Sequence, residues 1–189
     1  MNKSQNKYRI TSTRASWHDY NGGIYFVTIC TEKCIHYFGE IENMEMTLSP
    51  IGRFADDCIR NIETLHPNIY VASHQVMPNH VHMIVIIIED DADDENENDN
   101  AEATTTINKR MKRIADSCGH LSHIVSGFKY AVTKYARQNN IPFAWQKRFH
   151  DRIIRDQNEM NRIAEYIENN VAKWDLDKNN DKVEQFNKT

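Results

Sequence analysis

The stretch that decides the fold is Met77-Pro78-Asn79-His80-Val81-His82-Met83-Ile84-Val85, where two histidines flank a valine inside an apolar run. Such a run predicts a β-strand, in which side chains two positions apart lie on the same face. His80 and His82 therefore project together, while Val81 packs on the opposite face. Two neutral imidazoles side by side supply half of a divalent-metal site. The alternative is one buried, hydrogen-bonded histidine and one exposed histidine, and the triplet alone does not decide between them.

The segments around this strand alternate between strand and helix patterns. Ser49-Pro50 supplies an N-cap and an N1 proline at the start of one predicted helix. The expected elements, in chain order, are a strand at 24–31, a hairpin at 38–48, a helix at 51–65, strands at 69–76 and 81–88, a helix at 122–138, a strand within 143–154 and a helix at 159–169. This βαββαβ order predicts an α+β, ferredoxin-like (RRM-like) split antiparallel sheet, with helices on one face and an extra C-terminal helix. The RNA recognition fold shares this architecture and binds single strands.

With 189 residues the chain suits one domain, which we place at 21–174. Residues 1–20 form a polar arm with basic and aromatic residues that could contact a partner, among them Lys7, Tyr8, Arg9 and Arg14. Residues 175–189 form a polar tail. The longest apolar run, 83–88, is too short to cross a bilayer, and the N-terminus has no apolar core, so we expect no membrane segment and a cytoplasmic location.

The formal charge of −4 hides a mildly basic body. Nine acids lie in one tract, 89–102, that contains no Lys or Arg. Without these nine of the 27 acids, 18 remain against 23 basic residues, a balance of +5. A basic surface is expected of a protein that binds polyanions. We predict that 89–106 is a disordered acidic insertion.

The last predicted helix carries Tyr166 and Asn170, four residues apart and thus stacked on one helix face. A helix that lies over the sheet near His80 and His82 would set a phenol beside a carboxamide that can serve as a third metal ligand. The alternative is that Tyr166 packs in the core beside Ile163. Tyr130 and Tyr135 are rival candidates on the preceding helix.

The stretch Trp145–Arg155 alternates basic and aromatic residues in the predicted strand. Such a strand can follow phosphates and stack on bases, or it can simply carry one solvated charged face. The residues considered for DNA contact here are Trp145, Gln146, Lys147, Arg148, Arg152 and Arg155.

Together these residues resemble the single-tyrosine HUH transposases, especially the REP-associated tyrosine transposases. The resemblance covers about 8–174. Its motifs are Tyr25-Phe26-Val27-Thr28, the M-P-N-H-x-H frame at 77–82, Gly127-Phe128-Lys129, Trp145-Gln146 and Tyr166-Ile167-Glu168-Asn169-Asn170. This chain has Val171 where those relatives commonly carry a proline.

The resemblance implies a role for each matched position. His80, His82 and Asn170 would hold Mg²⁺ or Mn²⁺ at the scissile phosphate, and Tyr166 would be the nucleophile that forms a 5′-phosphotyrosine link. Lys129 joins the expected DNA contacts. The implied substrate is single-stranded or hairpin DNA of the REP-like palindromic kind. Insertion-sequence relatives are dimers whereas REP-associated ones can act as monomers, so a homodimer stays open.

We therefore expect a metal-dependent single-stranded DNA transposase, an enzyme that nicks and rejoins palindromic DNA. The first alternative is a non-catalytic nucleic-acid-binding module of the same fold. The second is an unrelated metal hydrolase that combines the histidines with carboxylates, although the dense supply of acids is the tract at 89–102.

Overall fold

The computed structural model describes residues 23–88 and 103–176, with side chains described for 23–88 and 119–175. The N-terminal arm with Lys7, Tyr8, Arg9 and Arg14, the acidic tract at 89–102 and the tail from 177 lie outside the described residues. Within the described ranges, every helix falls short of the length or apolarity needed to cross a bilayer.

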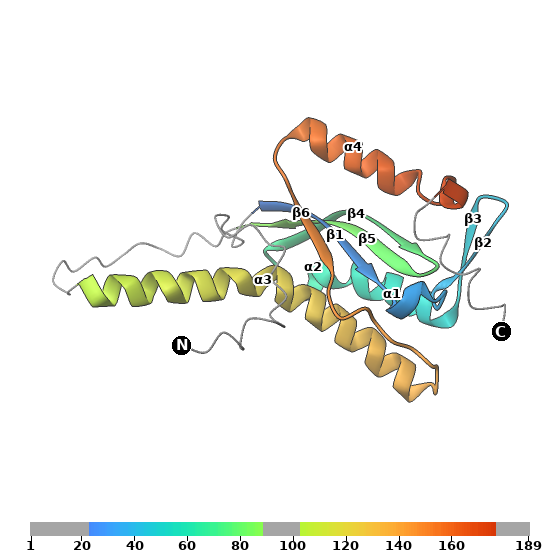
Figure 1. The fold of residues 1–189 in the computed structure, drawn as a ribbon, viewed down its shortest axis with the longest axis horizontal. Helices are drawn as coiled ribbons and strands as arrows, with labels where there is room; N and C mark the ends of the chain where they lie inside the picture. Colours follow the sequence, from blue (N-terminus) through green and yellow to red (C-terminus); the bar gives the residue numbers. More distant parts are fainter. Residues whose placement is uncertain (1–22, 89–102, 177–189) are drawn as a thin grey trace, which may run out of the picture.

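The centre of the molecule is a four-stranded antiparallel sheet (Figure 1). Its strands are β1 (Gly23–Cys30), β4 (Ile69–Met77), β5 (His80–Ile87) and β6 (His150–Ile154), in the order β4-β5-β1-β6. A separate hairpin pairs β2 (Gly39–Glu42) with β3 (Glu45–Leu48). This strand order is that of a ferredoxin-like split sheet, so the predicted fold class is confirmed.

Helices cover both faces of the sheet, as Figure 1 shows. One face carries α1 (Pro50–Arg60), α2 (Ile62–Leu65) and the long α3 (Ala103–Gln138). The other face carries α4 (Gln157–Glu168), the extra C-terminal helix, which contacts β4 and β5. A short 3₁₀ turn, Trp174–Leu176, follows α4.

Strand alternation divides the buried residues between the two faces. Tyr25, Val27 and Ile29 of β1 and Val81 of β5 point toward α1 and α3 and belong to the main core cluster. The opposite face has a second, smaller cluster formed by Ile84, Ile154, Ile163 and Ile167. β5 is buried on both sides, and its histidines belong to the α4 face.

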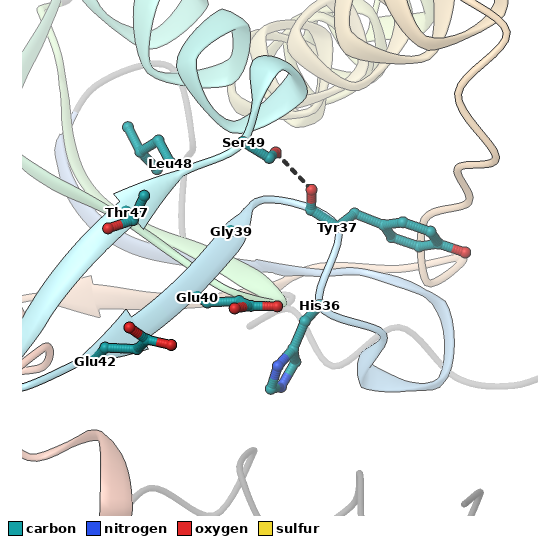
Figure 2. Close-up of a pocket in the computed structure, with 8 residues that line it drawn as sticks. All are labelled: His36, Tyr37, Gly39, Glu40, Glu42, Thr47, Leu48 and Ser49. Carbon is teal, nitrogen blue, oxygen red and sulfur yellow. Dashed lines mark hydrogen bonds between the residues drawn. The ribbon is translucent and has the colours of Figure 1, made fainter.

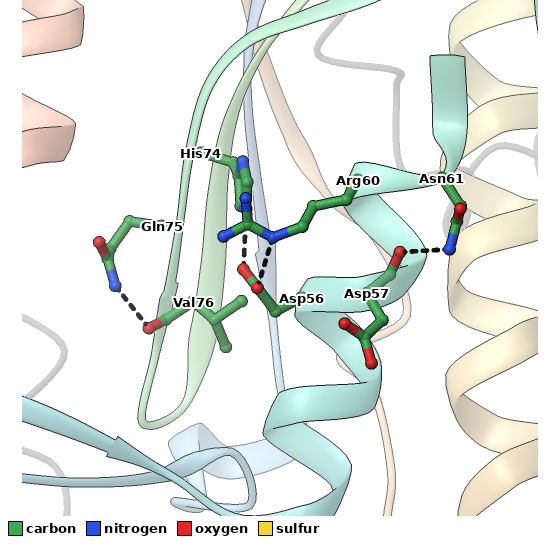
Figure 3. Close-up of polar contacts among 7 residues, drawn as sticks. All are labelled: Asp56, Asp57, Arg60, Asn61, His74, Gln75 and Val76. Carbon is green, nitrogen blue, oxygen red and sulfur yellow. Dashed lines mark hydrogen bonds and ion pairs between the residues drawn. The ribbon is translucent and has the colours of Figure 1, made fainter. Parts of the chain in front are cut away.

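Helix α1 begins where the sequence predicts, since the Ser49 hydroxyl accepts a hydrogen bond from the Gly52 amide at 3.1 Å. Asp56 fastens α1 to the edge strand β4, because its carboxylate lies 2.8 Å from both His74 Nε2 and Arg60 Nε (Figure 3). The two ion partners and a side-chain hydrogen bond from each hold the pKa of Asp56 below its usual value, against the opposing effect of burial.

Three predicted elements differ from the structure. The helix expected at 51–65 is broken at Asn61 into α1 and α2. Helix α3 begins at Ala103 rather than near residue 122, so it takes in 103–106 of the predicted insertion. Residues 107–118 contain Lys, Arg, Met and Ala, which favour helix, and Ile107, Met111 and Ile114 recur at helical spacing.

The third difference concerns 143–154, where the strand occupies His150–Ile154 alone. Phe143 and Trp145 lie outside β6, in a segment that is not a regular strand. They pack against each other and against Phe38. Aromatic packing into the main core therefore overrides the strand pattern in this segment, apart from one isolated bridge between Trp145 and Thr31.

Candidate active site

The two histidines of β5 lie together on the α4 face of the sheet. His80 is opposite Cys30 and His82 is opposite Thr28 in the pairing of β5 with β1. Their side chains are buried, and the two Nε2 atoms are 3.0 Å apart. The alternative arrangement of one buried and one exposed histidine does not occur.

Tyr166 lies directly over this pair. Its hydroxyl oxygen is 3.4 Å from Nε2 of His82 in the same chain, and its ring meets Phe26 edge-on at 6.1 Å between centroids. The side chain is 45 % exposed, so one side of the phenol faces solvent. Ile163 and Ile167, each on the inner face of α4, pack into the smaller core cluster and fix the height of the helix above the sheet.

The start of α4 is fixed by two acidic side chains. Asp156 caps the helix by accepting from the Glu159 amide at 2.8 Å. Glu159 accepts a hydrogen bond from the Arg155 backbone N–H and is paired with the Arg152 guanidinium, and these contacts lower the pKa of its carboxyl. The sequence analysis assigned Arg152 to DNA contact, whereas in the structure its guanidinium is engaged by this carboxylate.

Both imidazoles are held through their second ring nitrogen. His80 Nδ1 is 2.7 Å from Asn79 Oδ1, and His82 Nδ1 is 2.9 Å from the Thr28 hydroxyl. Partners of this kind orient histidines that bind metals. Thr28 and Asn79 both belong to motifs quoted above, yet their hydrogen bonds could not be read from the sequence.

Burial lowers the pKa of His80 to about 4, with a smaller contribution from nearby His36. His80 is therefore neutral at physiological pH. A neutral imidazole offers a lone pair, which is the form that coordinates a divalent cation.

Asn170 follows α4 and is 2 % exposed. Neither Oδ1 nor Nδ2 of its side chain has a hydrogen-bond partner within the described part of the chain. A buried polar group without a partner costs about 1–3 kcal/mol, so an occupant that uses this amide is expected. Two imidazoles, of which His80 is neutral, and an orphaned carboxamide fit a divalent cation. Among the side chains described, at 23–88 and 119–175, no three or more His, Cys, Asp or Glu are grouped so that they could hold a metal.

Two further residues, which the sequence analysis missed, lie beside the histidines. The Trp174 ring is 6.0 Å from that of His80 and 5.6 Å from that of His36. His36 also lines a cavity of about 330 Å³ beneath the β2–β3 hairpin, together with Tyr37, Gly39, Glu40, Glu42, Thr47, Leu48 and Ser49 (Figure 2). Burial lowers the pKa of His36, while the nearby Glu40 carboxylate acts to raise it. The buried Nε2 of His36 has no hydrogen-bond partner among the described residues.

The residues predicted to contact DNA fall into two groups. Lys129 and Trp145 are engaged with each other, because Lys129 Nζ lies 5.6 Å from the Trp145 ring centre and Trp145 Nε1 donates to the Lys129 carbonyl. Lys129 Nζ also donates to the Gln146 carbonyl at 2.7 Å. This placement favours a structural role for the pair. The side chains of Gln146, Lys147, Arg148 and Arg155 are exposed.

The rival tyrosines lie on α3, across the sheet from the histidines. Tyr135 stacks on Phe54 at 4.1 Å between ring centres. Tyr130 is 68 % exposed. Of these tyrosines the structure brings Tyr166 to the histidines.

A solved structure of known type shares the fold of this chain. A solved structure of a REP-associated tyrosine transposase bound to a REP hairpin is similar over 89 % of this chain and 77 % of its own, with a TM-score of 0.51 and 18 % identity. The chain therefore has a transposase-like fold. No protein-family model matches the sequence. An uncharacterized protein of Haemophilus influenzae (strain ATCC 51907 / DSM 11121 / KW20 / Rd) is 34 % identical over 168 residues, which is 88 % of this chain and 90 % of that protein. The chain belongs to the same family as this Haemophilus protein.

Proposed function

We propose that the protein is a metal-dependent DNA strand transferase that cleaves and rejoins single-stranded, hairpin-forming DNA through a covalent tyrosine intermediate. The observation that carries this proposal is the 3.4 Å separation between the Tyr166 hydroxyl and His82 Nε2, beside a second imidazole nitrogen 3.0 Å away. A phenol and two imidazoles on one face of a sheet, with a buried, orphaned carboxamide just after α4, make a suitable set for phosphodiester cleavage.

In this proposal His80, His82 and Asn170 hold Mg²⁺ or Mn²⁺. The bound cation would supply Lewis-acid stabilisation of the charge on the non-bridging phosphate oxygens. Asn79 and Thr28 keep the two imidazoles oriented, since each contacts the nitrogen that faces away from the partner histidine. Burial keeps His80 neutral and thus available as a ligand.

Tyr166 carries out the nucleophilic step. Its oxygen attacks the phosphorus and loses its proton, while the bond from phosphorus to the 3′-oxygen breaks and that oxygen takes up a proton. The products are a 5′-phosphotyrosine and a free 3′-hydroxyl. Because one phosphodiester replaces another, a second 3′-hydroxyl can reverse the step on a new strand without an external energy source.

The exposure of the site fits an unpaired strand. The imidazoles are buried on the face that α4 covers, whereas the phenol is partly open to solvent, so a phosphate has to approach groups that lie below the surface. An unpaired strand meets that demand more readily than a duplex. The hairpin bound to the structural neighbour supports the same substrate class. Because Tyr166 lies beside the histidines of its own chain, the reaction needs no second subunit.

The test uses a labelled single-stranded oligonucleotide that contains an imperfect palindrome with unpaired flanks. The full chain with Mg²⁺ is expected to give a covalent protein–DNA adduct on a denaturing gel. Tyr166→Phe removes the nucleophilic oxygen alone, so the adduct should disappear while binding of the oligonucleotide is retained.

Tyr130→Phe is the matched control, because it removes a phenol oxygen from the far side of the sheet and should leave the adduct intact. Chelation with EDTA should abolish the adduct, and added Mn²⁺ or Mg²⁺ should restore it. Persistence of the adduct in Tyr166→Phe would refute the assignment. Binding without any adduct across a panel of palindromes would favour the non-catalytic module.

A further inference from the structure

Four side chains form a continuous hydrogen-bonded row across the candidate site, and this row constrains where the protons lie. In order they are Asn79, His80, His82 and Thr28. The contacts are 2.7 Å from Asn79 Oδ1 to His80 Nδ1, 3.0 Å between the two Nε2 atoms, and 2.9 Å from His82 Nδ1 to Thr28 Oγ1.

The amide at one end fixes the proton of His80. Asn79 donates its Nδ2–H to the Cys34 carbonyl at 3.1 Å, so its Oδ1 is the atom that faces the imidazole. A carboxamide oxygen can only accept. His80 must therefore carry its proton on Nδ1, which leaves a lone pair on Nε2.

The proton of His82 then follows from the contact between the rings. At 3.0 Å one proton has to lie between the two Nε2 atoms, and His80 has none to give. His82 therefore donates from Nε2, and its Nδ1 accepts from the Thr28 hydroxyl. The Tyr166 oxygen is 3.4 Å from the same Nε2, a longer contact than that between the rings.

This assignment makes the two proposed ligands unequal. His80 already presents a lone pair on Nε2, whereas His82 presents a proton on the nitrogen that a cation would need. His82 must change tautomer before both rings can act as ligands. The residue that faces its other nitrogen then has to change from hydrogen-bond donor to acceptor.

We propose that Thr28 is a positioning residue whose hydroxyl permits this tautomer change in His82. The proton moves from Nε2 to Nδ1 of His82, and the Thr28 hydroxyl rotates from donating to accepting. The ring stays neutral, so no net proton is taken up or released by this change. A hydroxyl can play both parts by rotating, whereas the Asn79 amide is held with its oxygen toward the ring by the hydrogen bond from its Nδ2 to the Cys34 carbonyl. The inference rests on the proposed function because it takes the histidines as cation ligands.

The direct test is ¹⁵N NMR of the histidine ring nitrogens in the full chain at pH 8, with Mg²⁺ as the probe. Without added cation, His80 is expected as the Nδ1–H tautomer and His82 as the Nε2–H tautomer. Saturating Mg²⁺ should convert His82 to Nδ1–H and leave His80 as it was. An Nδ1–H or doubly protonated His82 before Mg²⁺ is added would overturn the inference, as would an unchanged His82 tautomer at saturation.

The second test measures Mg²⁺ affinity in Thr28→Val and Thr28→Ser. Valine has nearly the same shape and suits a strand, yet it leaves the new Nδ1–H of His82 without an acceptor. The Mg²⁺ affinity of Thr28→Val should fall by about 10- to 100-fold, the usual effect of losing a partner that orients a ligand. Thr28→Ser should bind Mg²⁺ as tightly as the wild type. Equal affinities in the three proteins would contradict the role of Thr28.

The adduct assay separates failure of this inference from failure of the proposed function. If the wild-type protein forms the adduct but its His82 tautomer does not change, the role of Thr28 is contradicted and the proposed function stands. If the histidine signals do not respond to Mg²⁺ and no adduct forms, both proposals are contradicted.

Discussion

The two faces of the sheet use the same strands for different purposes. On the face covered by α1 and α3, β1 and β5 contribute Tyr25, Val27, Ile29 and Val81 to a large apolar cluster. On the face covered by α4, β5 contributes His80 and His82 and β1 contributes Thr28, and the apolar cluster described there has four buried members. Asn170, whose buried amide has no partner among the described residues, directly follows the C-cap of α4, the helix on this second face. One face supplies stability, and the other retains polar groups that cost stability and are useful for chemistry.

The largest effect on stability should come from breaking the apolar face. Ile29→Ala removes a fully buried side chain next to Thr28 in sequence but on the opposite side of the strand. We expect a loss of about 2–5 kcal/mol in the free energy of unfolding, measured by urea titration. Adduct formation at low temperature, where the variant is still folded, should continue. Loss of the adduct in a folded Ile29→Ala protein would show that the two faces are not separable.

A second prediction concerns pH and the histidine face. The pKa of His80 in the folded protein is about 4, below its ordinary value of 6.5. The unfolded chain therefore takes up a proton first as the pH falls, and stability is lost between about pH 6.5 and pH 4. At about 1.4 kcal/mol per pKa unit this loss approaches about 3 kcal/mol.

His80→Leu is the reference for that measurement, because every other titrating group is shared with the wild type. Lowering the pH from 7.5 to 4.5 should reduce the unfolding free energy of the wild type by roughly 2–3 kcal/mol more than that of His80→Leu. Parallel pH curves for the two proteins would contradict the buried, neutral state of His80.

The smallest effect on stability should come from Asn170→Leu. Replacing a buried, unpartnered carboxamide by an apolar side chain of similar size should leave the free energy of unfolding unchanged or raise it by about 1 kcal/mol. Mg²⁺ affinity should nevertheless fall, since one proposed ligand is lost. A marked loss of stability would mean that the amide serves the fold rather than the site.

Much of this second face could be predicted, because the placement of its residues follows from the short-range periodicity of strands and helices. The two-residue period of a strand places His80 and His82 on one face, and the helical pattern after residue 156 predicts the helix that carries Tyr166. The sequence places Asn170 one turn further along the same helix, but Asn170 follows the C-cap Asn169 and lies outside α4. The partners of the histidines are a different matter. Asn79 in a turn before a strand looks like an ordinary turn residue, and its hydrogen bonds to His80 and Cys34 exist only in the folded chain.

The failures in prediction arise where tertiary packing overrides a local pattern. His36 reaches the site from an irregular segment that includes Lys33 and Cys34 at positive φ, a backbone path that no periodicity announces. Trp145 lies in an alternating stretch typical of a strand, but its ring packs against Phe38 and Phe143, contacts between segments far apart in the sequence that no local pattern indicates.

The end of β1 has one more consequence. The Thr31 amide donates to the Asn79 carbonyl, the Glu32 amide to the Ala144 carbonyl, and the Gln146 amide to the Cys30 carbonyl. The turn that precedes the histidines and the segment that leads to the exposed Lys147 are thereby tied to one short length of main chain. If a bound DNA strand contacts both segments, the distance between its binding site near Lys147 and its cleavage site at the histidines is fixed by main-chain hydrogen bonds. The number of nucleotides between the bound segment and the cleaved bond would then be constant and independent of the intervening bases.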